Sequence, residues 1–361
     1  MSAVIKHKLL GKTPEELKAI AVECGLPSYA GGQIAQWLYK KKVKTIDEMT
    51  NLSKAGREKL SERYETGAVA YSDCQESVDG TKKYLFPVTC AFQGGLNRIE
   101  TAEPGKIESG SIEAVMIPEL DRKTLCVSSQ AGCKMGCRFC MTGRQGFHGN
   151  LSAADILSQF VSVDEAESLT GTVFMGMGEP LDNYDNVKRA IDVLTADWGF
   201  GWSPKRITLS SIGVLPTLKR YLDETRCHLA ISMHDAFPDE RGELMPVQKS
   251  YPLKDVVNLI RQYDFTGQRR VSFEYTMFSG HNDDKRHADA IIRLLSGLEC
   301  RVNLIRFHKI PDFPYVSSPE GVMEVFRDRL NKAGITSTIR ASRGEDIFAA
   351  CGMLAGKHKQ Q

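Results

Sequence analysis

The sequence predicts an α/β fold, in which a small helical module precedes a larger domain built on a parallel sheet. Between residues 119 and 345, short apolar runs rich in β-branched residues alternate with helical stretches, the order typical of buried parallel strands covered by helices. Residues 1–70 instead show helical spacing of apolar side chains, and residues 71–118 show strand-like alternation. The 361 residues, 42% hydrophobic and 25% charged, suffice for one large domain and a smaller addition.

The N-terminal module is expected to contain three helices. The sequence Thr-Pro-Glu-Glu at residues 13–16 combines a capping residue, proline at the first helical position and glutamate at the third. A helix should therefore begin there, and Gly25 should end it. Two further helices are expected, one around Trp37, where apolar residues recur at helical spacing, and one after the capping residue Ser53.

Residues 71–118 are expected to form a β-rich connecting segment, with strands at residues 83–88 and 112–117, where apolar and polar side chains alternate. The larger domain, residues 119–345, should supply six more strands with helices between them. These strands are predicted at residues 124–127, 172–175, 206–209, 229–232, 271–276 and 302–307. Six strand–helix units are fewer than the eight of a full (β/α) barrel.

The helices between these strands should include residues 153–165 and 186–194. In parallel α/β architectures, the loops that carry chemistry follow the carboxyl ends of the strands. A run of cysteines follows the first predicted strand, and the sequence Gly-Met-Gly-Glu-Pro at residues 176–180 follows the second. Ser210 follows the third, and residues 232–234 close the fourth, so these motifs should share one end of the sheet.

The composition favours a cytosolic protein and leaves the choice of partner open. A net charge of +2 neither requires nor excludes a nucleic-acid partner. No apolar run approaches the roughly 20 residues of a membrane span, and the N-terminus has no signal-peptide core, so we expect no membrane association and reduced thiols. Basic clusters, although more often solvated faces, give weak support for RNA contact: Lys40, Lys41, Lys42 and Lys44 near Trp37, and Arg340 and Arg343 before Cys351.

Three of the ten cysteines, Cys133, Cys137 and Cys140, have the spacing C-x3-C-x2-C. Three thiolates at this spacing can hold three irons of a four-iron cluster, and the fourth iron is then left without a protein ligand. A structural zinc ion with His148 as the fourth ligand is the alternative, although most structural zinc sites pair their cysteines as C-x2-C knuckles. A disulfide framework is disfavoured, because a chain of this length buries an ample core.

Longer strings around these cysteines resemble one family. The run of three cysteines with Phe139 before the last one resembles the cluster loop of the radical S-adenosylmethionine (SAM) enzymes. The string CVSSQAGC with CRFCMTG, the loop GMGEP and the C-terminal RGEDIFAACG resemble the RlmN/Cfr branch of that superfamily, which methylates RNA adenines. Together these motifs are highly specific, and the resemblance extends from the N-terminal helices to the end of the chain.

The resemblance implies a radical SAM partial (β/α)6 barrel with a small N-terminal helical RNA-binding accessory domain. It also implies that residues 346–361 form a C-terminal segment carrying a methyl-accepting cysteine. The implied cofactors are a [4Fe-4S] cluster, bound by Cys133, Cys137 and Cys140, and S-adenosyl-L-methionine. The positions that match SAM-binding residues of the family are Gly178, Glu179, Ser210, Ser232, Met233, His234 and His308, the last of which stands where family members carry asparagine.

The family mechanism implies roles for two further cysteines and one carboxylate. C2 of adenine is electron-poor and cannot attack the methyl group of SAM directly. By resemblance, Cys351 accepts a methyl group from one SAM, and a radical made from a second SAM converts it to a methylene radical that adds to C2. Glu113 then accepts the C2 proton, and Cys126 releases the product through a transient disulfide with Cys351. Without the resemblance, Glu113 would be interpreted as an exposed strand carboxylate.

The implied substrates are adenine 2503 of 23S rRNA and adenine 37 of some tRNAs. The resemblance further implies a reducing system such as flavodoxin or ferredoxin, a cytoplasmic location and a monomeric enzyme. Two alternatives remain open. A Cfr-type enzyme would methylate C8 of the same rRNA adenine, and a metal-stabilised RNA-binding protein would have no catalytic activity.

Overall fold

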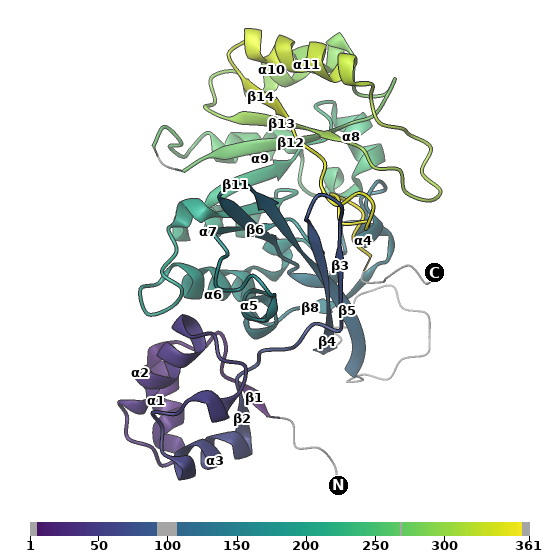
Figure 1. The fold of residues 1–361 in the computed structure, drawn as a ribbon. Helices are drawn as coiled ribbons and strands as arrows, with labels where there is room; N and C mark the ends of the chain where they lie inside the picture. The colour runs from purple at the N-terminus through teal and green to yellow at the C-terminus, as the bar shows by residue number, and fades with distance from the viewer. Residues whose placement is uncertain (1–5, 92–106, 268, 356–361) are drawn as a thin grey trace.

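A ten-stranded mixed sheet forms the centre of the computed structural model, which describes residues 6–91, 107–267 and 269–355 (Figure 1). The strands are arranged in the order β14-β13-β12-β11-β10-β9-β6-β5-β4-β3. Their bounds are β3 (Asp73–Glu76), β4 (Lys82–Ala91), β5 (Ile107–Glu119), β6 (Arg122–Cys126), β9 (Gly171–Phe174), β10 (Ile207–Ser211), β11 (His228–Ser232), β12 (Val271–Met277), β13 (Arg301–Arg306) and β14 (Thr336–Ile339).

The strands from β6 through β9 to β14 pair in parallel, and the six predicted strands of the larger domain all lie among them. The seventh parallel strand, β14, was not predicted and forms the open edge of the sheet. The larger connecting helices are α5 (Ala153–Ser162), α6 (Tyr184–Thr195), α7 (Leu215–Glu224), α8 (Pro238–Leu244), α9 (Leu253–Ile260), α10 (Lys285–Leu295) and α11 (Glu320–Lys332). The predicted fold class, an open α/β barrel with an N-terminal addition, is confirmed.

Apolar packing holds the helices on the parallel strands. Phe326 of α11 stacks on Tyr275 of β12 with ring centroids 5.5 Å apart, and both side chains are buried. Neighbouring helices, such as α5 with α6 and α10 with α11, also contact each other, so they form a continuous layer outside the sheet. One face of the parallel strands is thereby covered, as expected for a parallel sheet.

Strands β3, β4 and β5 extend the same sheet in antiparallel pairing, and β5 joins it to β6. The strands predicted at residues 83–88 and 112–117 lie within β4 and β5. Leu85 pairs with Glu113 in this register, and Lys83 lies two residues before Leu85. Because side chains two residues apart share one face of a strand, Lys83 and Glu113 lie diagonally opposite each other on the same face.

The N-terminal residues form a separate layer beside the parallel half of the sheet (Figure 1). Its helices are α1 (Pro14–Glu23), α2 (Ala30–Ala35) continued by a turn at Gln36–Lys40, and α3 (Lys54–Arg63), and its strands β1 (His7–Lys8) and β2 (Tyr64–Glu65) pair in parallel. The predicted capping sequence is present, since the Glu16 backbone N–H donates to Thr13 Oγ1 at 3.2 Å. Lys8 Nζ lies 2.5 Å from Asp155 Oδ1 of α5, which ties this layer to the larger domain.

Shorter elements complete the described chain. These are β7 (Gln130–Gly132), β8 (Phe147–Asn150), α4 (Met141–Arg144) and the 3-10 turns Ile46–Glu48, Pro180–Asn183, Pro204–Arg206 and Pro246–Lys249. The last described segment, coloured yellow in Figure 1, runs from β14 to lie beside α4 and β3. Within the described ranges, none of the helices has the length and apolar character needed to cross a membrane.

Candidate active site

A folded-back loop after β6 carries the three closely spaced cysteines. The strands β7 and β8 bracket this loop, and α4 begins directly after Cys140. The Cys133 N–H donates to the Gly146 carbonyl at 2.8 Å, and the Cys140 N–H donates to the Cys137 carbonyl at 3.2 Å. Gly132 has a φ of +74°, and a Cβ there would lie 2.0 Å from the Gly146 oxygen, so this close turn requires glycine.

The electrostatics of the three thiols favour a bound cation. Burial raises the pKa of Cys133 to about 12, and the charges of Glu179 and Cys140 add to that rise. Burial also raises the pKa of Cys137 well above its usual range, with further contributions from the other two cysteines. The three thiolates therefore lie close enough to repel one another, and a positively charged iron cluster would stabilise them.

The number of cysteines on the loop fits a cluster better than a structural zinc ion. A structural zinc ion takes four Cys or His ligands. Three cysteines suffice for a four-iron cluster, because each binds one iron and the fourth iron is left without a protein ligand.

The Gly-Met-Gly-Glu-Pro loop after β9 places a buried carboxylate next to the cysteine loop. Gly178 has a φ of +99°, and a Cβ there would lie 2.5 Å from Gln130 Cβ. Glu179 is 3% exposed and accepts hydrogen bonds from the backbone N–H groups of Leu181 and Ile212, each at 3.0 Å. Burial outweighs these bonds and raises the pKa of Glu179 to about 7. A ligand ammonium group would restore its charged form.

The ends of β10 and β11 supply the next predicted residues. Ser210 lies inside β10 rather than after it, because that strand continues to Ser211, so its predicted placement was wrong by two residues. Ser232 ends β11, and the Met233 side chain is completely buried, so only its backbone is available to a ligand. His234 has a φ of +55° and is 6% exposed.

His234 is fixed as a neutral imidazole. Its Nδ1 accepts a hydrogen bond from the Thr276 N–H at 3.1 Å, so the ring proton resides on Nε2. Burial and then the charge of Arg241 lower the pKa of His234 to about 3. The Phe139 ring of the cysteine loop packs edge-on against this imidazole, with centroids 4.8 Å apart, which joins the loop to the end of β11.

His308 follows β13 and contacts the C-terminal segment. Its Nδ1 lies 3.6 Å from Glu345 Oε1, and its side chain is 11% exposed. Burial lowers the pKa of His308, while the charge of Glu345 opposes this effect. His308 thus lies at the same end of the sheet as the other predicted residues, with a protein carboxylate as its partner.

Cys126 and Cys351, far apart in sequence, lie near each other. Burial raises the pKa of Cys126 to about 12, and the charge of Cys351 is the next largest cause. Burial also raises the pKa of Cys351, and the charges of Glu274 and Cys140 add to it. Cys351 is an exposed residue, and its charge acts on Cys126 of β6 and is acted on by Cys140 of the cysteine loop.

Hydrogen bonds hold the residues that follow Cys351 in the sequence. The Met141 N–H donates to the Gly352 carbonyl at 2.8 Å, and Thr142 Oγ1 donates to the Leu354 carbonyl at 2.7 Å. Both donors belong to α4, which follows the last cysteine of the loop. The C-terminal segment is therefore docked on the helix that the cysteine loop leads into.

Glu113 is buried and paired, so its interpretation as an exposed strand carboxylate was wrong. It has 0% exposure, and its Oε1 lies 3.2 Å from Lys83 Nζ, which is also buried. Its Oε2 accepts a hydrogen bond from the Ala355 N–H at 2.7 Å. The diagonal pairing of β4 and β5 places these two charges together, and Glu113 thereby also anchors the C-terminal segment.

Three residues of this region were missed in the sequence. The Gln130 side chain links two loops, because its Oε1 accepts from the Glu179 N–H at 2.9 Å and its Nε2 donates to Asp182 at 2.7 Å. Arg241 is completely buried beneath the end of β11, and Lys83 pairs with Glu113. In the sequence, Gln130 was noticeable only as part of the string before the first loop cysteine. In the sequence, Lys83 and Arg241 cannot be told apart from ordinary surface charges.

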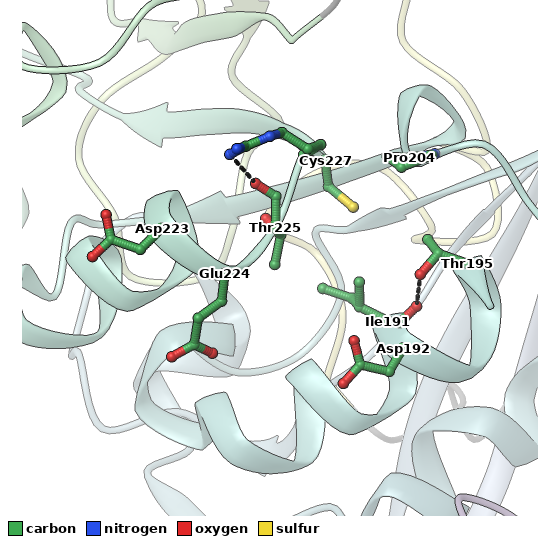
Figure 2. A pocket seen from close by; sticks show the side chains of 9 residues that line it. Ile191, Asp192, Thr195, Pro204, Asp223, Glu224, Thr225 and Cys227 are labelled. Carbon is green, nitrogen blue, oxygen red and sulfur yellow. Dashed lines mark hydrogen bonds between the residues drawn. The ribbon is translucent and has the colours of Figure 1, made fainter. Parts of the chain in front are cut away.

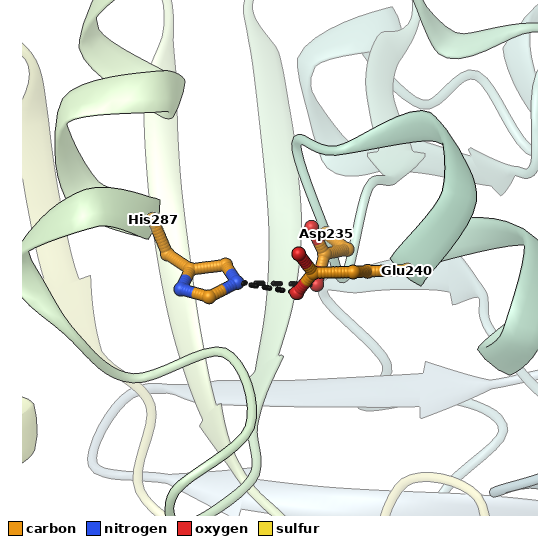
Figure 3. A group of neighbouring side chains, drawn as sticks. All are labelled: Asp235, Glu240 and His287. Carbon is orange, nitrogen blue, oxygen red and sulfur yellow. Dashed lines mark hydrogen bonds and ion pairs between the residues drawn. The ribbon is translucent and has the colours of Figure 1, made fainter.

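Two other features lie outside this site. A hollow of about 290 Å³ opens between the ends of α6 and α7 and the start of β11, at the amino ends of the strands (Figure 2). The group Asp235, Glu240 and His287 lies on the loop after β11, α8 and α10 (Figure 3). Both ring nitrogens of His287 lie within hydrogen-bond distance of carboxylates, Asp284 at 2.6 Å and Glu240 at 2.8 Å. Burial lowers the pKa of His287, but these carboxylates outweigh burial and raise it. The contacts of His287 with the carboxylates therefore account for this group.

Comparisons with known proteins agree with these features. Residues 127–291 match the model of the Radical SAM superfamily, and residues 7–66 match the ribosomal RNA large subunit methyltransferase N-terminal domain. Proteins named probable dual-specificity RNA methyltransferase RlmN are 56% identical in Porphyromonas gingivalis (96% of each chain) and 54% identical in Parabacteroides distasonis (98% of this chain, 97% of the relative). The crystal structure of a radical SAM methyltransferase from Sphaerobacter thermophilus has a TM-score of 0.87 at 34% identity, covering 97% of this chain and 99% of that one.

Proposed function

The chain belongs to the RlmN family of radical SAM RNA methyltransferases, and from this premise we propose that it methylates C2 of an adenine through an S-methyl group carried on Cys351. The observation that carries this proposal is that the segment of Cys351 lies beside Cys126. Cys126 pairs with Val115 of β5, and Glu113, two residues away on the same strand, accepts a hydrogen bond from the Ala355 N–H at 2.7 Å. A cysteine joined to RNA through a methylene group needs a second thiol nearby to release it, and an RNA-binding protein without catalysis would need neither cysteine.

The proposed cofactor sites use the loops at the carboxyl ends of the strands. Cys133, Cys137 and Cys140 would hold the [4Fe-4S] cluster, which supplies the electron that cleaves SAM to a carbon radical. Glu179 would bind the SAM ammonium group, for which its buried carboxyl is suited. Gly178, Ser210, Ser232, the Met233 backbone, His234 and His308 would form the rest of the SAM site.

The proposed steps divide between the two outer cysteines and Glu113. The Cys351 thiolate would attack the methyl carbon of one SAM, and S-adenosylhomocysteine would leave. A carbon radical made from a second SAM would take a hydrogen atom from the new S-methyl group, and the resulting methylene radical would add to C2. Glu113 accepts the C2 proton. Cys126 would then attack the Cys351 sulfur, so that the carbon–sulfur bond breaks and a disulfide forms, and the one electron left over from the radical addition would pass back to the oxidised cluster. An external reductant must reopen the disulfide.

Glu113 must change partners before it can accept a proton. Its two oxygens face Lys83 Nζ and the Ala355 N–H. The buried ammonium group of Lys83 is an ion-pair partner of this carboxyl group, with Nζ 3.2 Å from Oε1. The bond to Ala355 ties Glu113 to the segment of Cys351, so movement of that segment would change the contacts of the carboxylate.

The substrates, partners and domain limits belong to the same proposal. We infer that the RNA substrates are adenine 2503 of 23S rRNA and adenine 37 of some tRNAs, and that residues 1–70 form the accessory RNA-binding domain before a β-rich connection at 71–118. The core would then comprise residues 119–345, with residues 346–361 as the segment carrying the methyl-accepting cysteine. We also propose a cytoplasmic monomer that receives electrons from flavodoxin or ferredoxin.

Nucleoside mass spectrometry tests the carbon that is methylated. RNA treated with reconstituted enzyme, SAM and reductant should yield 2-methyladenosine when compared with standards of both isomers, and 8-methyladenosine would instead indicate the Cfr-type reaction. Cys351→Ala should abolish both products while the iron content stays at about four per chain. Methylation by Cys351→Ala would contradict the proposed mechanism.

A further inference from the structure

Arg241 of α8 is a buried cation that the proposed mechanism does not use. Its exposure is 0%, and its guanidinium donates to the carbonyls of Ser232 and Met233, each at 3.0 Å, and to Gln248 Oε1 at 2.5 Å. All of these acceptors are uncharged, and none of the ion pairs in the described part of the chain includes Arg241. Burying a charge without a direct ion pair is costly, so negative groups nearby stabilise Arg241.

The cysteine loop lies directly against the helix that carries Arg241. The Arg138 N–H donates to the Leu244 carbonyl, the last residue of α8, at 3.0 Å. Phe139 packs against His234 immediately after the carbonyls that Arg241 binds. Arg138 and Phe139 both lie between Cys137 and Cys140, so α8 and the end of β11 form the floor of this loop.

Arg241 stays charged next to the cysteine loop. Burial lowers the pKa of Arg241 to about 10, while the charges of Cys137 and Asp235 oppose this effect, so the guanidinium stays protonated near neutral pH. The buried Asp235 supplies one negative charge in this region. The cysteine loop packed against α8 is the second source of negative charge for Arg241.

A fixed positive charge beside a [4Fe-4S] cluster raises the reduction potential of that cluster. A [4Fe-4S] cluster gains one negative charge when it is reduced, and a cation in a low-dielectric interior stabilises the more negative state. We propose that Arg241 is a positioning residue that raises the reduction potential of the cluster held by Cys133, Cys137 and Cys140 and fixes the Ser232–Met233 backbone beside it. This inference rests on the proposed function, because it presumes a cluster at these cysteines.

Arg269, a second buried arginine of the larger domain, provides a matched control. It is also buried, and it donates to the carbonyls of Leu222 at 2.9 Å, Cys227 at 3.1 Å and Tyr221 at 3.4 Å. These acceptors lie before the amino end of β11, whereas Arg241 binds its carboxyl end. Replacing Arg269 thus removes a buried arginine and its carbonyl contacts far from the cysteine loop.

The test compares Arg241→Gln, Arg241→Lys and Arg269→Gln with the unaltered enzyme, all reconstituted with iron and sulfide. Redox titration, followed by electron paramagnetic resonance of the reduced cluster, should show a lower reduction potential for Arg241→Gln. At a fixed applied potential, the ratio of reduced to oxidised cluster should be at least tenfold smaller, which corresponds to 59 mV for one electron. Arg241→Lys keeps the charge and should keep the potential, but it should bind SAM more weakly because an ammonium group cannot reproduce the planar set of bonds. Arg269→Gln should leave the potential unchanged.

An unchanged potential in Arg241→Gln with about four irons would overturn the inference, as would an equal shift in Arg269→Gln. If Gln prevents folding, Arg241→Met removes the same charge with an apolar side chain, which buried sites often tolerate, and the same shift is expected. Failure of the unaltered enzyme to bind iron at all would instead contradict the proposed function, so the two failures are distinguishable.

Discussion

At the scale of single residues, burial determines the chemistry of Glu179. Its carboxyl has two backbone donors, and none of the ion pairs in the described residues includes it, so burial raises its pKa to about 7. The free protein therefore holds this carboxyl largely protonated below pH 7 and ionised above it. Only the ionised form attracts the ammonium group of SAM, so binding should release a proton wherever Glu179 begins protonated.

The affinity for SAM should accordingly fall as the pH drops through about 7, since Glu179 must then lose its proton to bind. Isothermal titration calorimetry at about pH 6 and about pH 8, in buffers of different ionisation enthalpy, measures both the affinity and the proton released. Glu179→Gln should bind SAM weakly with little dependence on pH. Equal affinities at both pH values in the unaltered protein would count against this role for Glu179.

The buried pair of Lys83 and Glu113 predicts a change in stability. Lys83→Met removes the buried ammonium group that pairs with Glu113, which should cost about 3–5 kcal/mol of unfolding free energy and lower the thermal midpoint. Lys82, whose partially exposed ammonium lies 2.9 Å from Glu165, is the matched control, and Lys82→Met should cost about 1 kcal/mol or less. The double variant Lys83→Met/Glu113→Gln should recover part of the loss. Equal costs for the two lysine variants would contradict the importance of this pair.

At the scale of elements, the turn between β3 and β4 holds the segment that carries Cys351. Asp346 Oδ1 accepts from Ser77 Oγ at 2.5 Å, and its Oδ2 accepts from the Val78 N–H at 3.2 Å. The Gly344 N–H donates to Asp79 Oδ2 at 3.1 Å. Together with the bonds from α4, these contacts fix the segment on both sides of the cysteine, so the antiparallel extension of the sheet serves to position Cys351.

Asp346→Ala should therefore reduce methyl transfer by roughly ten- to a hundredfold, because a thiol displaced by about 1 Å no longer meets its partners. The iron content should stay unchanged, since the cluster cysteines lie elsewhere. Asp328→Ala on the exposed face of α11, where the carboxylate pairs only with neighbouring Arg327 among the described ion pairs, serves as the control. Single-turnover assays measure the effect, and equal rates for both variants would contradict the positioning role.

Strands with continuous apolar character were predictable, whereas edge strands were not. β11 and β12 are buried on most positions, so their sequences are apolar and β-branched. β14, with the sequence TSTI, and β3, with the sequence DCQE, lie at the two edges of the sheet and carry polar residues, so no apolar run marks them. The helix α8 was also missed, because its seven residues include four charged ones and begin with proline.

At the scale of the whole molecule, the site joins parts of the chain that the sequence cannot place together. The cysteine spacing indicated a cluster loop, but the pairing of Cys126 with Cys351 came only from the family resemblance. Lys83 and Arg241 are buried, and the sequence gives no sign of this, because burial depends on tertiary packing that a single sequence does not display. The predicted residues nevertheless gather at the carboxyl ends of the strands, as the α/β architecture requires.

The most direct test of the account is the intact mass of a Cys126→Ala variant after reaction with RNA, SAM and reductant. Without the releasing thiol, the methylene bridge between Cys351 and the adenine should persist, and nuclease digestion followed by mass spectrometry should find one nucleotide attached to the peptide that contains Cys351. Cys227→Ala, which removes a buried cysteine before the start of β11, should release its product normally. Free methylated RNA from Cys126→Ala at the normal rate, with no nucleotide on Cys351, would contradict the proposal that these two cysteines act on one methyl group.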